Sequence, residues 1–249
     1  MNKTTRGLVE YALAQLGKPY WYGTYGQIGT EELYEAKKKQ YPNYYKATDF
    51  SQQFGQRVHD CSGLIDGYLM SDTPVSIPVY KKEYDYSANG LQKACIEKGD
   101  ISTIPDDPGV CVFYNGHVGV YIGDGFVIEA RGHKYGVEMH KISVRPWKTW
   151  GYHPLITKQA STQDDAQTVK MIKIDMPVLK KGMKNIGSII TLQRLLISLG
   201  YKGKNNQILE LDGSFGGNTD YALRNFQQNK GLVVDGSVGK ATWSALLSE

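Results

Sequence analysis

The stretch His59–Leu69, HDCSGLIDGYL, decides how the first half of the chain folds. Its Asp60 is a favoured residue at a helix start, because a short carboxylate can accept the backbone N–H groups that the first turn leaves unpaired. Apolar side chains then recur at helical spacing, at Leu64, Ile65, Tyr68 and Leu69. The segment therefore predicts a helix that begins at Asp60 and carries Cys61 in its first turn.

The position of Cys61 predicts a reactive thiol. Unpaired N–H groups and the helix dipole favour an anion at a helix start, so we expect the thiolate form to be stabilised there. The alternative is a small buried apolar residue, the commonest role of a free cysteine, and Cys95 and Cys111 fit that role better than Cys61 does. With three cysteines and no CxxC pair, neither a disulfide framework nor a zinc site is expected.

A nucleophilic cysteine needs a base, and the chain has five histidines. His117 is favoured because it opens the run HVGVYIG, a predicted strand in which a side chain has a fixed direction. His59 lies too close to Cys61 in sequence to reach over the helix start. The other three occur in a loop-like segment, at a strand position that can be exposed, and before a proline: His133, His140 and His153.

Hairpin geometry nominates Glu129 as the partner of His117. A three-residue loop at 123–125, with glycine in the left-handed position, is a favoured connection and pairs Ile122 with Phe126. Glu129 then shares a face with His117 and lies diagonally across from it, about 7–8 Å away between backbones. A two-residue loop would reverse the alternation and leave Glu129 as a solvated carboxylate on the other face.

The rest of the first part mixes helix and strand. Three helices are predicted from residues that can cap them, namely Thr4 or Thr5, Thr30 and Ser87. After Pro108 come short β-rich runs, GVCVFY, HVGVYIG, FVIEA and GVEMHKI. Helices followed by an antiparallel sheet indicate an α+β domain.

Composition bounds the class of protein. The chain has 249 residues, 41% hydrophobic and 22% charged, which excludes a disordered or collagen-like chain and suits one large or two smaller domains. No apolar run is long enough to cross a membrane, and no secretory signal is recognisable, so neither membrane insertion nor standard export is expected. No metal, cofactor or nucleic-acid motif stands out, and nothing indicates an oligomeric state.

Eight of the 18 tyrosines fall within the first 45 residues. Tyrosine rings can form a core or line a groove for polar polymers, and the sequence leaves both readings open. The two readings concern five of these eight residues: Tyr25, Tyr34, Tyr41, Tyr44 and Tyr45.

A polar stretch beginning at Thr157 reads as a linker, so we expect domains at 1–156 and 178–249 joined by 157–177. Basic and acidic residues are equal in number before the linker, and the net charge of +4 comes from the remainder. There DGSFGGNT recurs 23 residues later as DGSVGKAT, each copy a glycine-bearing turn before a helix. Together with the preceding helical run LQRLLISLG, the repeat predicts a small all-α three-helix domain.

The second part resembles the peptidoglycan-binding domain found on many wall hydrolases. The resemblance rests on LQRLLISLGY, DGSFGGNTDYALRNFQ and GLVVDGSVGKATWSALL, whose DG, FG, FQ, VG and TW elements occur in order. It implies bacterial peptidoglycan as the partner of this domain.

The first part resembles the NlpC family of papain-like cell-wall cysteine peptidases. The resemblance covers roughly residues 6–153 and is carried by DCSGL, GHVGVYIGDG, VIEA and LGKPYWYG. It implies a papain-like fold, with Cys61 as nucleophile, His117 as general base and Glu129 at the third polar position, where the family commonly has histidine. It further implies that substrate is contacted by Tyr20, Asp60 and Ser62.

The implied reaction is amide hydrolysis through a thioester, with an oxyanion site formed by the Cys61 N–H and the Tyr20 hydroxyl. The resemblance indicates the bond between the γ-carboxyl of D-glutamate and the diamino acid of a stem peptide. An N-acetylmuramoyl-L-alanine amidase with the same triad, a non-catalytic wall-binding protein, and a cysteine-dependent transferase or toxin are the alternatives. Without an export signal, the layout resembles a phage or prophage lysin, made in the cytoplasm and released to the wall.

Overall fold

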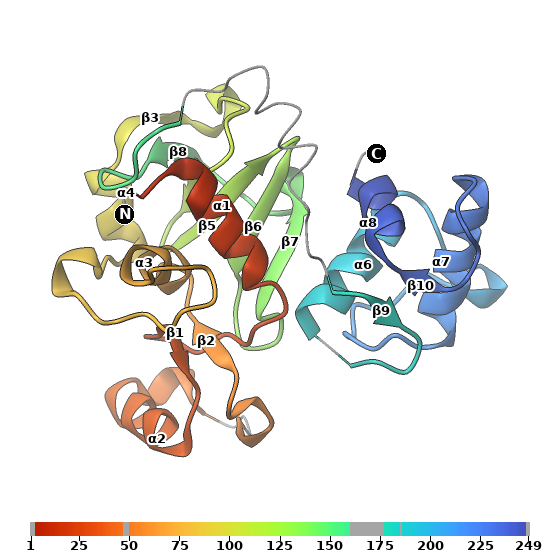
Figure 1. Ribbon diagram of the computed structural model, residues 1–249, viewed down its shortest axis with the longest axis horizontal. Coiled ribbons are helices and arrows are strands. Elements are labelled where there is room, and N and C mark those ends of the chain that lie inside the picture. Colours follow the sequence, from red (N-terminus) through yellow and green to blue (C-terminus); the bar gives the residue numbers. More distant parts are fainter. Residues whose placement is uncertain (1–2, 47–49, 160–176, 185, 248–249) are drawn as a thin grey trace.

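The computed structural model describes residues 3–46, 50–159, 177–184 and 186–247 (Figure 1). Helices and strands of the first part are α1 (Thr5–Ala14), β1 (Tyr25–Ile28), α2 (Glu31–Gln40), β2 (Arg57–His59), α3 (Gly63–Met70), α4 (Ala88–Ala94), β3 (Ile96–Asp100), β4 (Cys111–Tyr114), β5 (His117–Gly123), β6 (Phe126–Ala130), β7 (Val137–Lys141) and β8 (Thr149–Tyr152). The second part contains β9 (Leu179–Lys180), α6 (Ile186–Ser198), α7 (Gly217–Asn229), β10 (Ser237–Val238) and α8 (Lys240–Leu247).

The three predicted capping residues begin their helices. The hydroxyl of Thr4 accepts the N–H of Gly7, and those of Thr30 and Ser87 accept N–H groups in the first turns of α2 and α4. Each hydroxyl satisfies one of the donors that a helix start leaves unpaired, so these segments fold as the local sequence predicts.

Six strands of the described chain form one antiparallel sheet, in the order β3-β8-β4-β5-β6-β7. One face packs against α1 and α3, as Figure 1 shows for α1 running across β5 and β6. The apolar contacts on this face include Leu8, Ala12, Leu64, Ile65, Val118, Val120 and Ile128. Helices that precede a sheet and cover one of its faces confirm the predicted papain-like α+β class.

The β5–β6 hairpin differs in detail from the expectation. Phe126 pairs with Gly123 and not with Ile122, so the turn has two residues, 124 and 125, with φ of 51° and 74°. The predicted three-residue loop is therefore wrong. A bulge between Tyr121 and Gly123 adds one residue to β5 instead.

The bulge preserves the facing that the site needs. A loop shorter by one residue would turn the side chains of β6 to the opposite face relative to β5. The extra residue in β5 reverses that change. Val120 consequently pairs with Ile128, and the strands continue from there in regular register. Glu129 therefore lies on the same face as His117, although the loop length was predicted wrongly.

Three helices make up most of the second part, as the sequence predicts, and a buried glutamine holds each repeated turn. The side-chain amide of Gln193 donates to the Asp212 carboxylate at 2.7 Å, and its oxygen accepts the Gly213 N–H at 3.2 Å. Gln227 repeats this arrangement with Asp235, at 2.9 Å, and Gly236, at 3.0 Å. The repeat is thus a structural device in which a helix clamps the loop that follows it.

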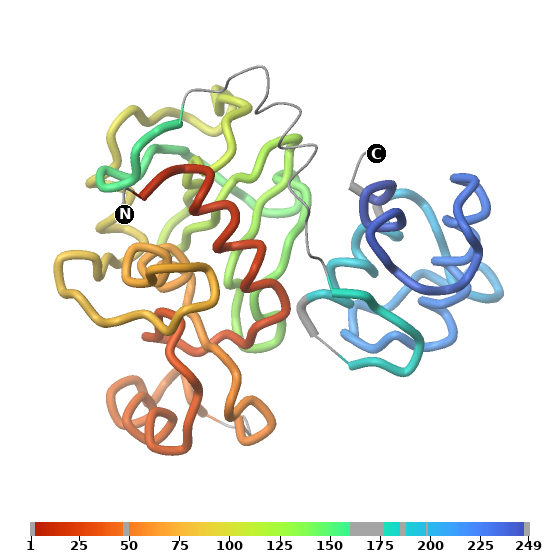
Figure 2. The backbone as a smooth tube through the Cα atoms, viewed as in Figure 1, coloured from red at the N-terminus to blue at the C-terminus, as the bar shows by residue number. Residues whose placement is uncertain are grey.

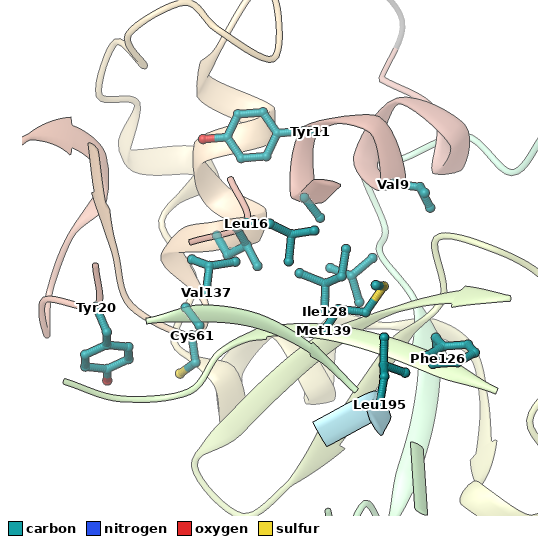
Figure 3. Packing of buried hydrophobic residues seen from close by; sticks show 14 of the residues in the cluster. Val9, Tyr11, Leu16, Tyr20, Cys61, Phe126, Ile128, Val137, Met139 and Leu195 are labelled. Carbon is teal, nitrogen blue, oxygen red and sulfur yellow. The ribbon is translucent and has the colours of Figure 1, made fainter. Parts of the chain in front are cut away.

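Helix α6 lies along β7, the outermost strand of the sheet (Figures 1 and 2). The Thr191 hydroxyl accepts the backbone N–H of Met139 at 3.3 Å, and Arg194 Nε lies 3.5 Å from Glu138 Oε2. Leu195 joins the same buried apolar cluster as Met139 (Figure 3). The second part therefore covers the edge of the first part's sheet.

The start of the predicted linker is paired with the first part of the chain. The Thr157 N–H donates to the carbonyl of Lys3 at 2.8 Å, and the Thr157 carbonyl accepts the Thr5 N–H at 3.1 Å. Residues 160–176 of that linker lie outside the described residues. No helix in the described ranges is both long and apolar enough to span a bilayer.

Candidate active site

Asp60 caps the helix start next to Cys61. Its carboxylate accepts the Gly63 N–H at 2.7 Å, and its carbonyl accepts the Leu64 N–H at 3.1 Å. Helix α3 is assigned only from Gly63, but this bonding extends the first turn back to Asp60. Cys61 is therefore the residue directly after the cap, as its sequence position predicts.

The Cys61 thiol lies between this helix start and the β4–β5 turn. Its sulfur is 3.9 Å from the carbonyl oxygen of Gly116, the residue that precedes His117. Only 9% of Cys61 is exposed, and in Figure 3 its sulfur points away from Leu16 and Val137. The thiol thus sits at the margin of the apolar cluster, beside the strand that carries the candidate base.

Electrostatics at the thiol differ from the expectation. Burial raises the pKa of Cys61 to about 12, and the nearby Asp60 carboxylate adds to the rise, while the backbone N–H groups of Ser62 and Val118 act in the opposite direction. The predicted stabilisation of a resting thiolate is therefore wrong, because desolvation outweighs the helix start. A neutral thiol is a weak nucleophile, so a catalytic role of Cys61 would require a neighbouring base.

Two aromatic rings and one hydrogen bond hold the His117 side chain. Tyr114 and Trp147 stack on the imidazole with ring centroids 4.9 and 5.9 Å away. Its Nε2 is hydrogen-bonded to Oε2 of Glu129. Because Nε2 is engaged, Nδ1 is the nitrogen that can exchange a proton with a thiol.

Glu129 is fully buried and holds more than one partner. Its Oε1 contacts Nε2 of His140 at 2.6 Å, and Arg145 Nε lies 2.9 Å from the same oxygen as an ion pair without hydrogen-bond geometry. Burial alone would raise the pKa of Glu129, but hydrogen bonds with His117 and His140 outweigh it and hold that pKa well below its usual range. The carboxylate is therefore ionised beside the imidazole of His117.

His140 and Arg145 were missed as parts of the site by sequence reasoning. His140 was treated as a strand residue that can be exposed, whereas it is buried, with Nδ1 3.0 Å from the Lys141 carbonyl. The available signal was the alternation in VEMHK, which places Glu138 and His140 on one strand face. That face continues the one carrying Glu129, because Glu138 pairs with Glu129 across β6 and β7.

A second buried carboxylate completes this cluster. Glu138 accepts a hydrogen bond from Arg131 at 2.7 Å and lies beside Arg194. Glu129, Glu138 and His140 offer atoms within 4.8 Å of one another that could hold a metal ion. Guanidinium groups contact both carboxylates, however, so the chain itself compensates their charge and the cluster suits a cation poorly.

The three predicted substrate residues lie near Cys61, two of them as its neighbours in the chain. Burial raises the pKa of Tyr20 far above its usual value, and negative charge at Asp60 or Cys61 adds to the rise, so its hydroxyl remains a donor. The Ser62 hydroxyl donates to Asp60 at 3.4 Å, and the Gly23 N–H donates to the same carboxylate at 2.8 Å. Asp60 thus ties the loop that follows Tyr20 to the start of α3.

The tyrosine-rich segment forms mostly a core. Trp21 is fully buried at the centre of an apolar cluster that includes Tyr45, with Tyr34 and Tyr41 packed against it. Tyr44 differs, because 49% of it is exposed and its ring stacks on that of Tyr22 with 3.6 Å between centroids. Tyr22 and Tyr44 are close enough to Tyr20 to contribute to the rise of its pKa.

Comparisons with known proteins agree with this architecture. Residues 17–155 match the model of the NlpC/P60 family, and residues 187–246 match that of a putative peptidoglycan binding domain. A search of curated proteins found no match.

Solved structures resemble parts of the chain at low identity. NlpC2 from Trichomonas vaginalis is 17% identical, with a TM-score of 0.36 over 61% of this chain and 47% of its own. The peptidoglycan hydrolase RipB from Mycobacterium tuberculosis is 22% identical, with a TM-score of 0.35 over 61% of this chain and 67% of its own. The chain spans less than half the length of NlpC2 and of its relative NlpC1. Since the family's model matches more than half of its residues, the chain belongs to the NlpC/P60 family.

Proposed function

We propose that the chain is a peptidoglycan hydrolase that cleaves a stem-peptide amide through a Cys61–His117–Glu129 triad. One observation carries the proposal. The Cys61 sulfur lies 3.9 Å from the carbonyl oxygen of Gly116, and the next residue, His117, is hydrogen-bonded to the ionised Glu129. The proposed triad thus combines Cys61, just before α3, with His117 of β5 and Glu129 of β6. Nucleophile, base and orienting group in that order are the requirements of thiol catalysis.

The reaction proceeds in two acyl transfers. Nδ1 of His117 takes the thiol proton as the Cys61 sulfur attacks the amide carbonyl. The imidazolium returns that proton to the leaving amine, the C–N bond breaks and a thioester remains. His117 then removes a proton from water, which attacks the thioester and releases the carboxylic acid and the free thiol.

The buried surroundings of the thiol suit this order of events. A neutral Cys61 in the resting enzyme means that charge separates only when the proton reaches His117. The imidazolium formed at that moment lies against the Glu129 carboxylate, which is already ionised. Such preorganised charge stabilises the transition state without reorganising solvent.

The hydroxyl of Tyr20 and the N–H of Cys61 are the donors we assign to the oxyanion. Tyr20 stays protonated because burial raises its pKa, so it can donate throughout the working pH range of the enzyme. Asp60 and Ser62 flank Cys61 in the chain and are hydrogen-bonded to each other, and we assign them to the binding of the substrate.

We propose the γ-D-glutamyl–diamino acid bond as the target, with the N-acetylmuramoyl-L-alanine amide as the alternative. Digestion of purified walls followed by mass spectrometry distinguishes them. New amino-terminal diamino acid supports the endopeptidase, whereas glycan with free lactyl ends supports the amidase. Release of neither product by the intact chain would contradict the proposed hydrolase.

The second part supports delivery to the wall, because it matches a putative peptidoglycan binding domain. We propose that the chain acts on the cell wall after release from the cell in which it is made, as a phage or prophage lysin does. Turbidity loss of wall suspensions tests catalysis directly. Clearing by the unmodified chain but not by Cys61→Ala supports an enzyme. No clearing by the unmodified chain, with wall binding retained, supports a non-catalytic binding protein.

A further inference from the structure

A hollow of about 790 Å³ opens on the second part of the chain, between α7 and the loop that follows α6. Its volume lies in the range typical of small-ligand sites. Tyrosine and asparagine side chains dominate its lining, namely Tyr201, Asn205, Asn206, Tyr221, Asn225 and Asn229. We call this feature the Tyr221 groove.

One wall of the groove is a single stripe of α7. Tyr221, Asn225 and Asn229 are spaced four residues apart, and such residues lie one above another on a helix. Tyr221 is 43% exposed, so its ring is available at the surface. The stripe presents one phenol and two amides to a molecule lying along the helix.

The opposite wall is a short loop with an uncommon backbone. Asn205 and Asn206 both have positive φ, 55° and 63°, a region that asparagine tolerates better than most residues. The side chain of Asn218 on α7 accepts the Lys204 N–H at 3.3 Å and so fastens the loop to the helix. The two walls are therefore held at a fixed separation.

Folding requirements explain Tyr201, whose ring centroid lies 5.3 Å from that of the buried Phe226, but not the stripe of α7. The residues that recur in both copies of the repeat serve the glutamine clamps of Gln193 and Gln227. The groove residues do not recur: the position 23 residues after Tyr221 is Ser244. A feature present in one copy only, and exposed, points to a ligand.

The chemistry of the lining indicates a carbohydrate. An asparagine amide both donates and accepts hydrogen bonds, which matches hydroxyl and acetamido groups, and a tyrosine ring can cover the apolar face of a sugar. Among the described residues that line the groove, none is acidic and the one charged side chain is that of Lys202. A stem peptide with its carboxylates would call for more cations than this.

We propose that the Tyr221 groove binds the glycan strand of peptidoglycan through its N-acetylated sugars. The proposal rests on the proposed function and assigns the part of the wall that the second domain recognises. It places the contact on α7 and on the loop that follows α6, whereas α6 itself packs against β7 of the first part. The anchored chain would then hold the glycan while the thiol acts on the attached peptide.

The test uses the full chain with Cys61→Ala, so that the wall is not digested. Isothermal titration with the N-acetylglucosamine tetramer should give saturable binding. Tyr221→Ala combined with Asn225→Ala should weaken it at least about tenfold, because the double change removes the exposed ring and the central amide of the stripe. Val233→Ala is the control, because Val233 is 79% exposed on the same domain and is not among the lining residues. Asn229→Ala, a milder change at an exposed position, should weaken binding in the same direction.

Three results would overturn the proposal: no binding of the tetramer, equal affinity in the groove variants and the control, or competition by free stem peptide but not by sugar. Cleavage of a soluble stem peptide by chains that retain Cys61 keeps the two proposals separate. The groove variants should cleave it at the unmodified rate, whereas a failure of the proposed function appears as no cleavage by the unmodified chain.

Discussion

Two buried carboxyl groups in the catalytic part have opposite electrostatic fates. Asp66 on α3 has one hydrogen bond, from the Tyr86 N–H at 3.3 Å, and burial raises its pKa to about 9. Glu129 on β6 is equally buried, yet its hydrogen bonds with His117 and His140 hold its pKa well below the usual range. Burial by itself neutralises a carboxyl group, and only partners placed against it keep it charged.

The two residues of the proposed catalytic pair also differ in their electrostatic surroundings. Cys61 shares the poorly solvated surroundings of α3, where burial raises its pKa to about 12. His117 shares the charged surroundings of Glu129 on the sheet. The proposed nucleophile is therefore neutral, while the proposed base lies against a carboxylate that would stabilise its protonated form.

The largest loss of kcat is expected for a change at Cys61, the neutral member of the proposed pair. Cys61→Ala removes the nucleophile and should lower kcat for wall hydrolysis by about 10⁴-fold or more, as in other covalent catalysts. Release of free amino groups from purified walls measures it. Sedimentation with walls should be unchanged, and clearing at the normal rate would remove the thiol mechanism.

At the charged side, Glu129→Gln should lower kcat by about 10²- to 10⁴-fold, because the amide cannot stabilise the imidazolium of His117. Glu138→Gln is the matched control: Glu138 pairs with Glu129 across the strands and is also buried against arginine, but it contacts Arg131 and Arg194 and not His117. Both variants should lose thermal stability. Equal kcat losses in the two would show that Glu129 acts only through folding.

A smaller loss is expected for Tyr20→Phe. Removing one oxyanion donor typically costs about 100-fold in kcat. The phenyl ring keeps the packing against His133, whose ring centroid lies 5.2 Å away. Steady-state kinetics on a soluble stem peptide should show the change in kcat with little change in KM, and an unaltered kcat would exclude the hydroxyl from the oxyanion site.

The smallest effect concerns Asp66 and appears as pH-dependent stability. In the unfolded chain an aspartate ionises near pH 3.9, whereas folded Asp66 stays protonated to about pH 9. Its contribution to stability is therefore full below about pH 4 and is lost as the pH rises toward 9. Asp66→Asn should raise Tm by at least about 3 °C at pH 8, equivalent to about 1 kcal/mol, and by much less at pH 4.

The exposed Asp72 provides the comparison for that measurement. Asp72→Asn should shift Tm similarly and slightly at both pH values. A shift for Asp66→Asn that is the same at pH 4 and pH 8 would mean that the carboxyl group is ionised in the fold.

Local signals predicted a large part of the fold. The caps at Thr4, Thr30 and Ser87 and the helix start at Asp60 depend on neighbours within four residues, so the sequence specifies them directly. The facing of Glu129 was also predicted, although a bulge and a shorter turn replaced the expected loop.

What the sequence could not supply depends on distant contacts. The pKa of Cys61 is set by burial under elements far away in the chain, which no local pattern expresses. His140 and Arg145 reach Glu129 only after β7 has paired with β6 and the following loop has returned. The two glutamine clamps were not predicted either. Gln193 bonds to Asp212, 19 residues later, and Gln227 bonds to Asp235, eight residues later, and both separations exceed one helical turn.

The packing of α6 along β7 affects how a fragment that contains only the first part would behave. A fragment cut within residues 160–176 would lose Thr191 and Leu195 and leave the outer strand's backbone donors and apolar side chains open to solvent. Unprotected strand edges pair readily with other copies. The first part produced by itself should therefore self-associate through β7, which is a different defect from the loss of a wall-binding domain.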